Sequence, residues 1–78
     1  MAIAGVIVKM KTGSSETVRH ELDEMKGVDV EMTTPQGEFI LTVEADNIEN
    51  LHKACVKIEK MNGVLGVYPS YITTEDEK

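Results

Sequence analysis

Residues 28–44 read VDVEMTTPQGEFILTVE, and this stretch decides the fold. Apolar and polar residues alternate over residues 28–33 and again over residues 38–44, which is typical of two half-buried strands. Residues 34–37 between them, TPQG, have Pro early and Gly late, the chemistry of a tight turn. A hairpin closed at this turn brings the apolar residues of both strands onto one face. The expected pairs are Met32 with Phe39, Val30 with Leu41, and Val28 with Val43.

Two other segments have the period of an amphipathic helix. Residues 14–25 begin with two serines, either of which can cap the helix start, and the apolar residues Val18, Leu22 and Met25 recur at i, i+4 and i+7. Residues 47–61 form the second segment, where Asp46 followed by Glu49 resembles a capping box with Asp46 as the cap. Its apolar stripe consists of Ile48, Leu51, Cys55, Ile58 and Met61.

Two further strands, residues 3–11 and 65–72, complete a βαββαβ order. This order predicts an α+β, ferredoxin-like domain, with a four-stranded antiparallel sheet and two helices on one face. Because proline cannot donate a ladder hydrogen bond, Pro69 indicates that the last strand lies at an edge. We expect one domain over residues 1–72 and a charged, frayed tail over residues 73–78. The predicted core beneath the helices contains Val6, Val8, Met10, Val28, Val30, Met32, Phe39, Leu41 and Val43.

The other face of this sheet, the open face, would be uncovered. The alternation predicts an apolar floor there, made of Ile3, Ile7 and Ile40. Beside it would lie an acidic rim of carboxylates on the hairpin: Asp29, Glu31, Glu38 and Glu44. The same face would carry Gly5, Lys9 and Thr42, and, if Val67 points inward, also Tyr68, Ser70 and Ile72. An uncovered apolar surface on a small protein usually marks an interaction site.

The charge distribution supports this interpretation. The formal net charge is −6, and residues 28–50 contain six acidic residues and no Lys or Arg. Such a one-sided segment produces a negative field that favours a basic partner. Acidic side chains on an edge hairpin also protect strands from aggregation, and that structural role remains an alternative.

Several classes of function are disfavoured by the composition. Three aromatic residues and an acidic balance argue against nucleic-acid binding. No nucleophile elbow or phosphate-binding glycine loop is present, so we expect neither an enzyme nor a cofactor. His52 and Cys55 are spaced to share a metal, but Cys55 belongs to the apolar stripe and we interpret it as structural. His20 is interpreted as a solvated surface residue, and no metal site is expected.

The N-terminal apolar run has no basic residue before it and no cleavage-type sequence after it, and it is too short to cross a bilayer. A single cysteine excludes an internal disulfide framework. We therefore expect a cytoplasmic protein with no membrane association.

Several segments together resemble the NapD family. They are the opening IAGVIV at residues 3–8, KGVDV at residues 26–30, GEFILTVEA at residues 37–45, and the closing NGVLGVYPSY at residues 62–71. The resemblance covers nearly the whole chain and depends on the order and spacing of these segments.

The resemblance implies a cytoplasmic chaperone of the periplasmic nitrate reductase. Members bind the twin-arginine signal peptide of the catalytic subunit and delay export until its cofactor is loaded. Such peptides have a basic start and an apolar middle, which fits an apolar floor beside an acidic rim. The expected peptide-binding residues are Ile3, Gly5, Ile7, Lys9, Asp29, Glu31, Ile40, Thr42, Glu44 and Tyr68, in a protein that acts as a monomer.

Two alternatives share the βαββαβ order. One is an oligomeric amino-acid-sensing domain of the leucine-responsive regulator type, which has a similar Gly-x-aromatic opening of the third strand at residues 37–39. The other is a small ferredoxin-like monooxygenase, which would need a pocket between helices and sheet. The filled core predicted here, with no catalytic His or Asn pointing into it, disfavours the monooxygenase.

Overall fold

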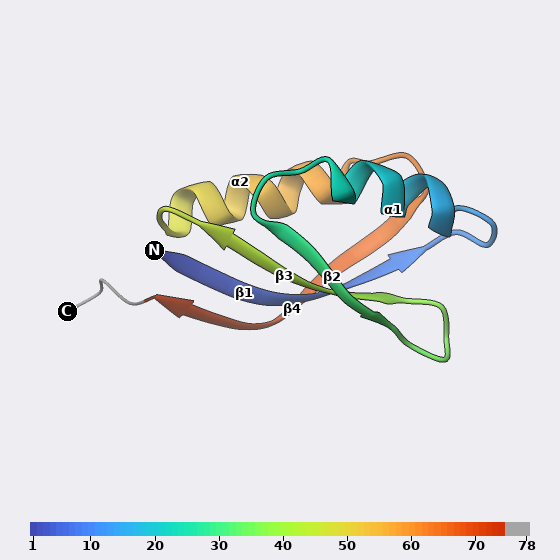
Figure 1. The fold of residues 1–78 in the computed structure, drawn as a ribbon, viewed down its shortest axis with the longest axis horizontal. Helices are drawn as coiled ribbons and strands as arrows, with labels where there is room; N and C mark the ends of the chain where they lie inside the picture. The colour runs from blue at the N-terminus through green and yellow to red at the C-terminus, as the bar shows by residue number, and fades with distance from the viewer. Residues whose placement is uncertain (75–78) are drawn as a thin grey trace.

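A computed structural model describes residues 1–74 of the chain. It contains six elements in βαββαβ order (Figure 1). In chain order they are β1 (Ala2–Met10), α1 (Ser15–Asp23), β2 (Val28–Thr33), β3 (Phe39–Ala45), α2 (Ile48–Glu59) and β4 (Val64–Thr74).

The four strands form one antiparallel sheet in the order β2-β3-β1-β4, and both helices lie on the same side of it (Figure 1). The predicted ferredoxin-like fold is therefore confirmed. β1 lies in the centre, paired with β3 on one side and β4 on the other. β4 is an edge strand, as Pro69 predicted.

The core lies between the sheet and the helices. Alternate residues of β1 and β3 point toward the helices and are almost fully buried, where they meet Val18 and Leu22 of α1 and Leu51 and Ile58 of α2. Burial of each such aliphatic side chain contributes about 1.5–3 kcal/mol. This one-sided packing leaves the other face of the sheet without a covering layer among the described residues. The buried strand residues are Ala2, Ala4, Val6, Val8, Val28, Phe39, Leu41 and Val43.

The hairpin of β2 and β3 follows the predicted register only in its first half. Val28 and Val30 lie opposite Val43 and Leu41, as expected, but a bulge then interrupts the ladder between Val30 and Met32. Because one residue is inserted, Met32 lies opposite Ile40 instead of Phe39. The prediction that Met32 belongs to the core was wrong, and its side chain is 55% exposed.

β4 contains two register shifts against β1. Val67 lies opposite Val8 and packs on the core, and Tyr68 lies opposite Ile7 on the open face, as predicted. A shift between Gly5 and Val6 then inserts Ser70 into the strand. Beyond it, Tyr71 takes the position opposite Gly5.

The same shift places Ile72 opposite Ala4, whose side chain points toward the helices. The expectation that Ile72 lies on the open face was therefore wrong, because an inserted residue exchanges the two faces of the strand that follows it.

The start of α2 differs from the predicted capping box. The cap is Asn47, whose side-chain oxygen accepts a hydrogen bond from the backbone N–H of Asn50 at 2.8 Å. Asp46 lies one residue before it, so its predicted cap role was wrong. Ile48 is the first residue of the helix and is 43% exposed, although it was expected within the buried stripe.

The last strand extends further than predicted. Thr73 and Thr74 pair with Ile3 and Ala2, so these two residues belong to the sheet and not to the tail. The remainder of the predicted tail lies outside the described residues.

Candidate functional site

The open face is built on β1, the central strand. Ile3, Gly5 and Ile7 alternate with the buried residues Ala4 and Val6, so they face away from the helices. In Figure 1 this face lies below the sheet, on the side opposite α1 and α2. These three residues therefore lie on the open face, as the alternation in the sequence predicted.

The apolar floor forms across two strands. Ile7 lies directly opposite Ile40 of β3, and both are half-buried. Ile3 is also half-buried and lies opposite Glu44. The three isoleucines therefore keep apolar surface accessible without being fully solvated.

The acidic rim lies on the open face, as the sequence predicted, with Asp29 and Glu31 on β2, Glu38 directly before β3 and Glu44 near the end of β3. Asp29 lies opposite Thr42, and the hydroxyl of Thr42 donates a hydrogen bond of 3.0 Å to Oε2 of Glu31. Glu31 is the residue inserted at the bulge, and this bond holds its carboxylate on the open face. Asp29 and Glu44 are exposed and form no ion pair within residues 1–74.

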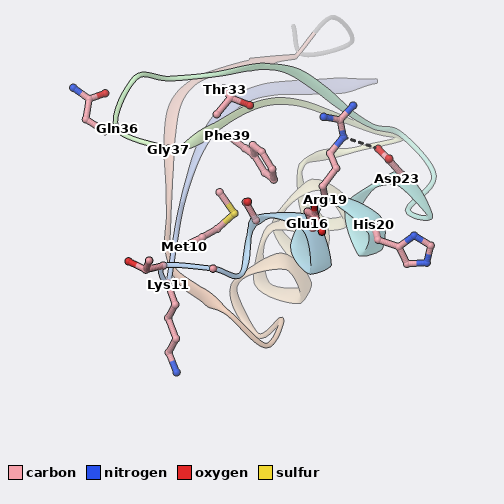
Figure 2. Close-up of a pocket in the computed structure, with 13 residues that line it drawn as sticks. Met10, Lys11, Glu16, Arg19, His20, Asp23, Thr33, Gln36, Gly37 and Phe39 are labelled. Atoms are coloured by element: carbon pink, nitrogen blue, oxygen red, sulfur yellow. Dashed lines mark hydrogen bonds and ion pairs between the residues drawn. The ribbon is translucent and has the colours of Figure 1, made fainter.

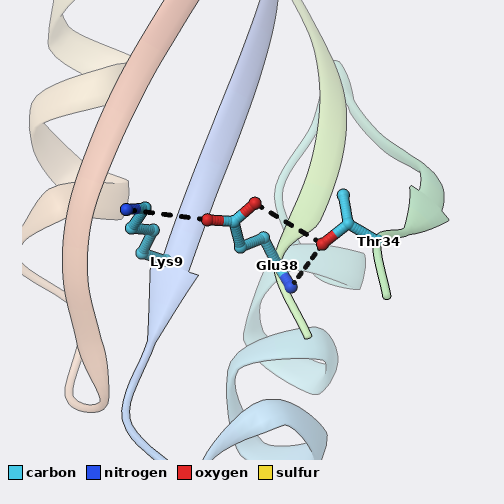
Figure 3. A network of polar contacts seen from close by, with 3 residues as sticks. All are labelled: Lys9, Thr34 and Glu38. Atoms are coloured by element: carbon cyan, nitrogen blue, oxygen red, sulfur yellow. Dashed lines mark hydrogen bonds and ion pairs between the residues drawn. The ribbon is translucent and has the colours of Figure 1, made fainter. Parts of the chain in front are cut away.

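Glu38 differs from the rest of the rim because it is already held by neighbouring groups (Figure 3). One carboxylate oxygen, Oε2, lies 3.8 Å from the ammonium of Lys9. The other, Oε1, accepts a hydrogen bond of 3.4 Å from the hydroxyl of Thr34, which in turn accepts one from the backbone N–H of Glu38 at 3.0 Å. The ammonium of Lys9 also lies 5.6 Å from the centroid of the Tyr68 ring.

Two residues of the open face were not found from the sequence. The bulge in β2 brings Met32 beside Ile40, and the shift in β4 brings Tyr71 beside Gly5. The ring of Tyr71 occupies the space that a side chain at position 5 would need. A glycine within an otherwise apolar strand is a known sign of such close approach, and it was the available signal for Tyr71.

An open hollow of about 620 Å³ lies at the end of the molecule, between the β1–α1 loop and the β2–β3 turn. In Figure 2 the side chains of Lys11 and His20 point away from Phe39. Among the charged residues that line the hollow, Arg19 pairs with Asp23 at 3.3 Å. His20 lies 3.4 Å from Glu24 and is solvated, as predicted.

A smaller apolar cleft of about 140 Å³ lies between α2 and β4. Its lining includes Cys55, Ile48 and Ile72, together with Pro69 and His52. Burial raises the pKa of the Cys55 thiol above its ordinary value, so the thiol stays protonated near neutral pH.

Within residues 1–74, no three His, Cys, Asp or Glu side chains are grouped closely enough to hold a metal ion. In the same part of the chain, neither helix has the length and apolar character needed to span a bilayer.

The fold and the open face define a ferredoxin-like domain with an uncovered sheet surface, apolar at its centre and acidic at one side. The chain belongs to the NapD protein family, whose family model matches residues 1–76. The resemblance found in the sequence is thereby confirmed.

Among solved structures, the chain is similar to the solution structure of the E. coli Tat proofreading chaperone protein NapD. The TM-score is 0.82 and the sequence identity 25%, over 97% of this chain and 81% of that one. No curated protein matches the chain.

Proposed function

We propose that this protein is a cytoplasmic proofreading chaperone that binds a twin-arginine signal peptide on the open face of its sheet. The observation that carries the proposal is the apolar floor beside Asp29 and Glu44, whose carboxylates form no ion pair within residues 1–74. Membership of the NapD family and the likeness to a Tat proofreading chaperone support it.

The basic and apolar parts of a twin-arginine peptide are complementary to the acidic rim and the apolar floor. Twin-arginine signals begin with basic residues and continue with an apolar segment. The apolar segment would cover the floor and remove its isoleucines from water, which contributes about 25 cal/mol per Å² of apolar surface. The arginines would reach carboxylates of the acidic rim, of which Asp29 and Glu44 form no ion pair within residues 1–74.

The client we propose is the catalytic subunit of a periplasmic nitrate reductase. This follows from the family, and the open face itself defines only a basic and apolar peptide. A direct comparison tests it: the signal peptide of such a subunit should bind more tightly than a twin-arginine peptide with a different apolar segment. Equal affinities would contradict the proposed client, but they would still agree with binding of twin-arginine peptides as a class.

The peptide class is tested by titrating a synthetic twin-arginine signal peptide into ¹⁵N-labelled protein. The largest amide shifts are expected on β1 and β3, at Gly5, Ile7 and Thr42. Shifts confined to α1 and α2 would contradict the proposal, because those helices lie on the other side of the sheet.

Charge substitution gives a second test with a matched control. Asp29→Asn combined with Glu44→Gln should weaken peptide binding roughly 2- to 30-fold at low salt, since each of the two exposed ion pairs contributes about 0.2–1 kcal/mol. The dependence of affinity on salt should also decrease. Glu49→Gln with Glu59→Gln removes the same charge from α2 and should have a much smaller effect.

We further propose that the protein acts as a monomer. A second copy on the open face would cover the floor that the peptide needs. Light scattering at micromolar concentration should give the mass of one chain. A stable dimer or ring would favour the amino-acid-sensing alternative, whose ligand pockets lie between subunits.

A further inference from the structure

We propose that Glu38 and Tyr68 form a preformed binding site for one arginine of the peptide, and that Lys9 occupies this site when no peptide is bound. The inference deepens the proposed function and rests on it. It assigns to Lys9 the role of an internal competitor that the arginine displaces.

The carboxylate of Glu38 is already oriented to bind a cation. Its side chain is 22% exposed, less than that of its partner Lys9 at 54%. The hydroxyl of Thr34 holds Oε1 through a 3.4 Å hydrogen bond, which leaves Oε2 directed at the ammonium. A side chain already held in one orientation loses less conformational entropy on binding than a mobile one.

The ring of Tyr68 supplies the second half of the site. It comes from β4, opposite Ile7 of β1, and the Lys9 ammonium lies 5.6 Å from its centroid. A carboxylate and an aromatic face are the two groups that a guanidinium uses best, because its planar fork can pair with one and stack on the other. Lys9, a point charge, satisfies both only partly.

The position of the site agrees with a peptide that also covers the apolar floor. Val8 lies opposite Phe39, so Lys9 and Glu38 follow directly along β1 and β3 from the pair formed by Ile7 and Ile40. A chain that buries its apolar segment on the floor can therefore place a preceding arginine at Glu38 without leaving the open face.

The energetics allow the exchange. An exposed lysine–carboxylate pair is weak, typically about 0.2–1 kcal/mol, so an arginine with a better geometry can displace it. The ion pair between Lys9 and Glu38 still reduces the apparent affinity of the peptide, because the site can bind an arginine only when Lys9 has left it. Replacing Lys9 by a neutral residue should therefore tighten binding.

The test is a cycle of Lys9→Met and Glu38→Gln, with the affinity of a twin-arginine peptide measured by calorimetry. In the otherwise unchanged protein, Lys9→Met should tighten binding roughly two- to five-fold. In the Glu38→Gln background the same change should have almost no effect, because no carboxylate remains for Lys9 to block. Lys57→Met, on α2, is the control for net charge.

Each possible result of this cycle either supports or overturns the inference. Equal tightening in both backgrounds would mean that Lys9 acts only through the general field, and would overturn the inference. Weaker or unchanged binding of Lys9→Met would overturn it as well. If the original protein binds no peptide at all, the proposed function fails and this inference fails with it. Lys9→Gln repeats the test should Lys9→Met prove poorly folded.

The role of Tyr68 has its own measurement. Exchanging the two peptide arginines for lysines should weaken binding to the original protein, and the penalty should shrink for Tyr68→Leu, which keeps apolar bulk but offers no ring face. An equal penalty in both proteins would exclude stacking and leave Glu38 as the sole recognition group.

Discussion

The ring of Tyr71 lies over the backbone of Gly5, in the centre of the open face. A Cβ atom added at position 5 would collide with the ring carbons Cε2, Cδ2 and Cζ of Tyr71. Position 5 therefore requires glycine, because β4 places an aromatic ring against the middle of β1. The pair belongs to the surface proposed to bind the peptide, and glycine at position 5 of β1 leaves the space that the Tyr71 ring of β4 occupies.

This relationship predicts an energetic coupling between positions 5 and 71. Gly5→Ala should lower the free energy of unfolding by about 1 kcal/mol, because the added methyl group displaces the Tyr71 ring. In a Tyr71→Ala background the same change should be neutral or slightly stabilising, since alanine loses less backbone entropy than glycine. Urea denaturation of the four proteins gives the coupling, and a coupling near zero would show that the ring does not depend on Gly5.

Gly27 is expected to be less replaceable than another glycine of similar backbone conformation. Its φ is +82°, and an added Cβ would lie 2.5 Å from the backbone oxygen of Glu44. Gly13 has φ +85° with nothing within 4 Å of such an atom. Gly13→Ala should cost about 1–2 kcal/mol through backbone strain alone.

Gly27→Ala should cost about 1–2 kcal/mol more than that, because the clash is with backbone that cannot rotate away. It would also disturb the hydrogen bond of 2.8 Å from the Glu44 N–H to the Gly27 carbonyl. Chemical denaturation of both variants tests the difference. Equal losses would show that Gly27 is needed for its φ angle and not for its contact.

The fold was predictable from the sequence because the period of each segment matched one element. Alternation in both hairpin strands placed Val30 opposite Leu41, where the structure has it. The register failed at Glu31, where a bulge needs only one residue in a compact conformation and leaves no clear mark in the sequence. Met32 was assigned to the wrong face for this reason.

The candidate surface was predictable to the same extent. Ile3 and Ile7 of β1 and Asp29 and Glu44 of the hairpin lie on regular strand and were placed correctly on the open face. Ile72 follows the insertion at Ser70 and was for that reason assigned to the wrong face, while Tyr71, which the same insertion brings to the open face, was not identified. The hydroxyl of Ser70 bonds to the carbonyl of Gly5 at 3.2 Å, a contact between residues far apart in sequence that local patterns do not reveal.

Asn47 is predicted to stabilise α2, and Asp46 is not. Asn47→Ala removes the side-chain acceptor of the Asn50 N–H and should lower the free energy of unfolding by about 1 kcal/mol. Asp46→Ala removes only a charge near the helix start and should change it by less than about 0.5 kcal/mol. Thermal or urea unfolding measures both. A larger loss at Asp46 would restore the capping assignment made from the sequence.

Cys55 should react slowly in the folded protein. Its thiol is partly covered in the cleft between α2 and β4, and burial raises its pKa, so little thiolate exists near neutral pH. Iodoacetamide should therefore modify the native protein at pH 7.5 far more slowly than the urea-unfolded chain. Comparable rates would mean that the cleft opens readily in solution.

The same thiol sets an expected pH dependence of stability. Because its pKa is higher in the folded than in the unfolded chain, the folded state holds its proton more firmly. As pH rises past the unfolded value of roughly 8.5, the unfolded thiol ionises first and the free energy of unfolding decreases. Cys55→Ala should lack this part of the alkaline loss, and its stability relative to the original protein should therefore improve between pH 7.5 and pH 9.5. A difference between the two proteins that stays constant over this range would show that the thiol is not desolvated in the fold.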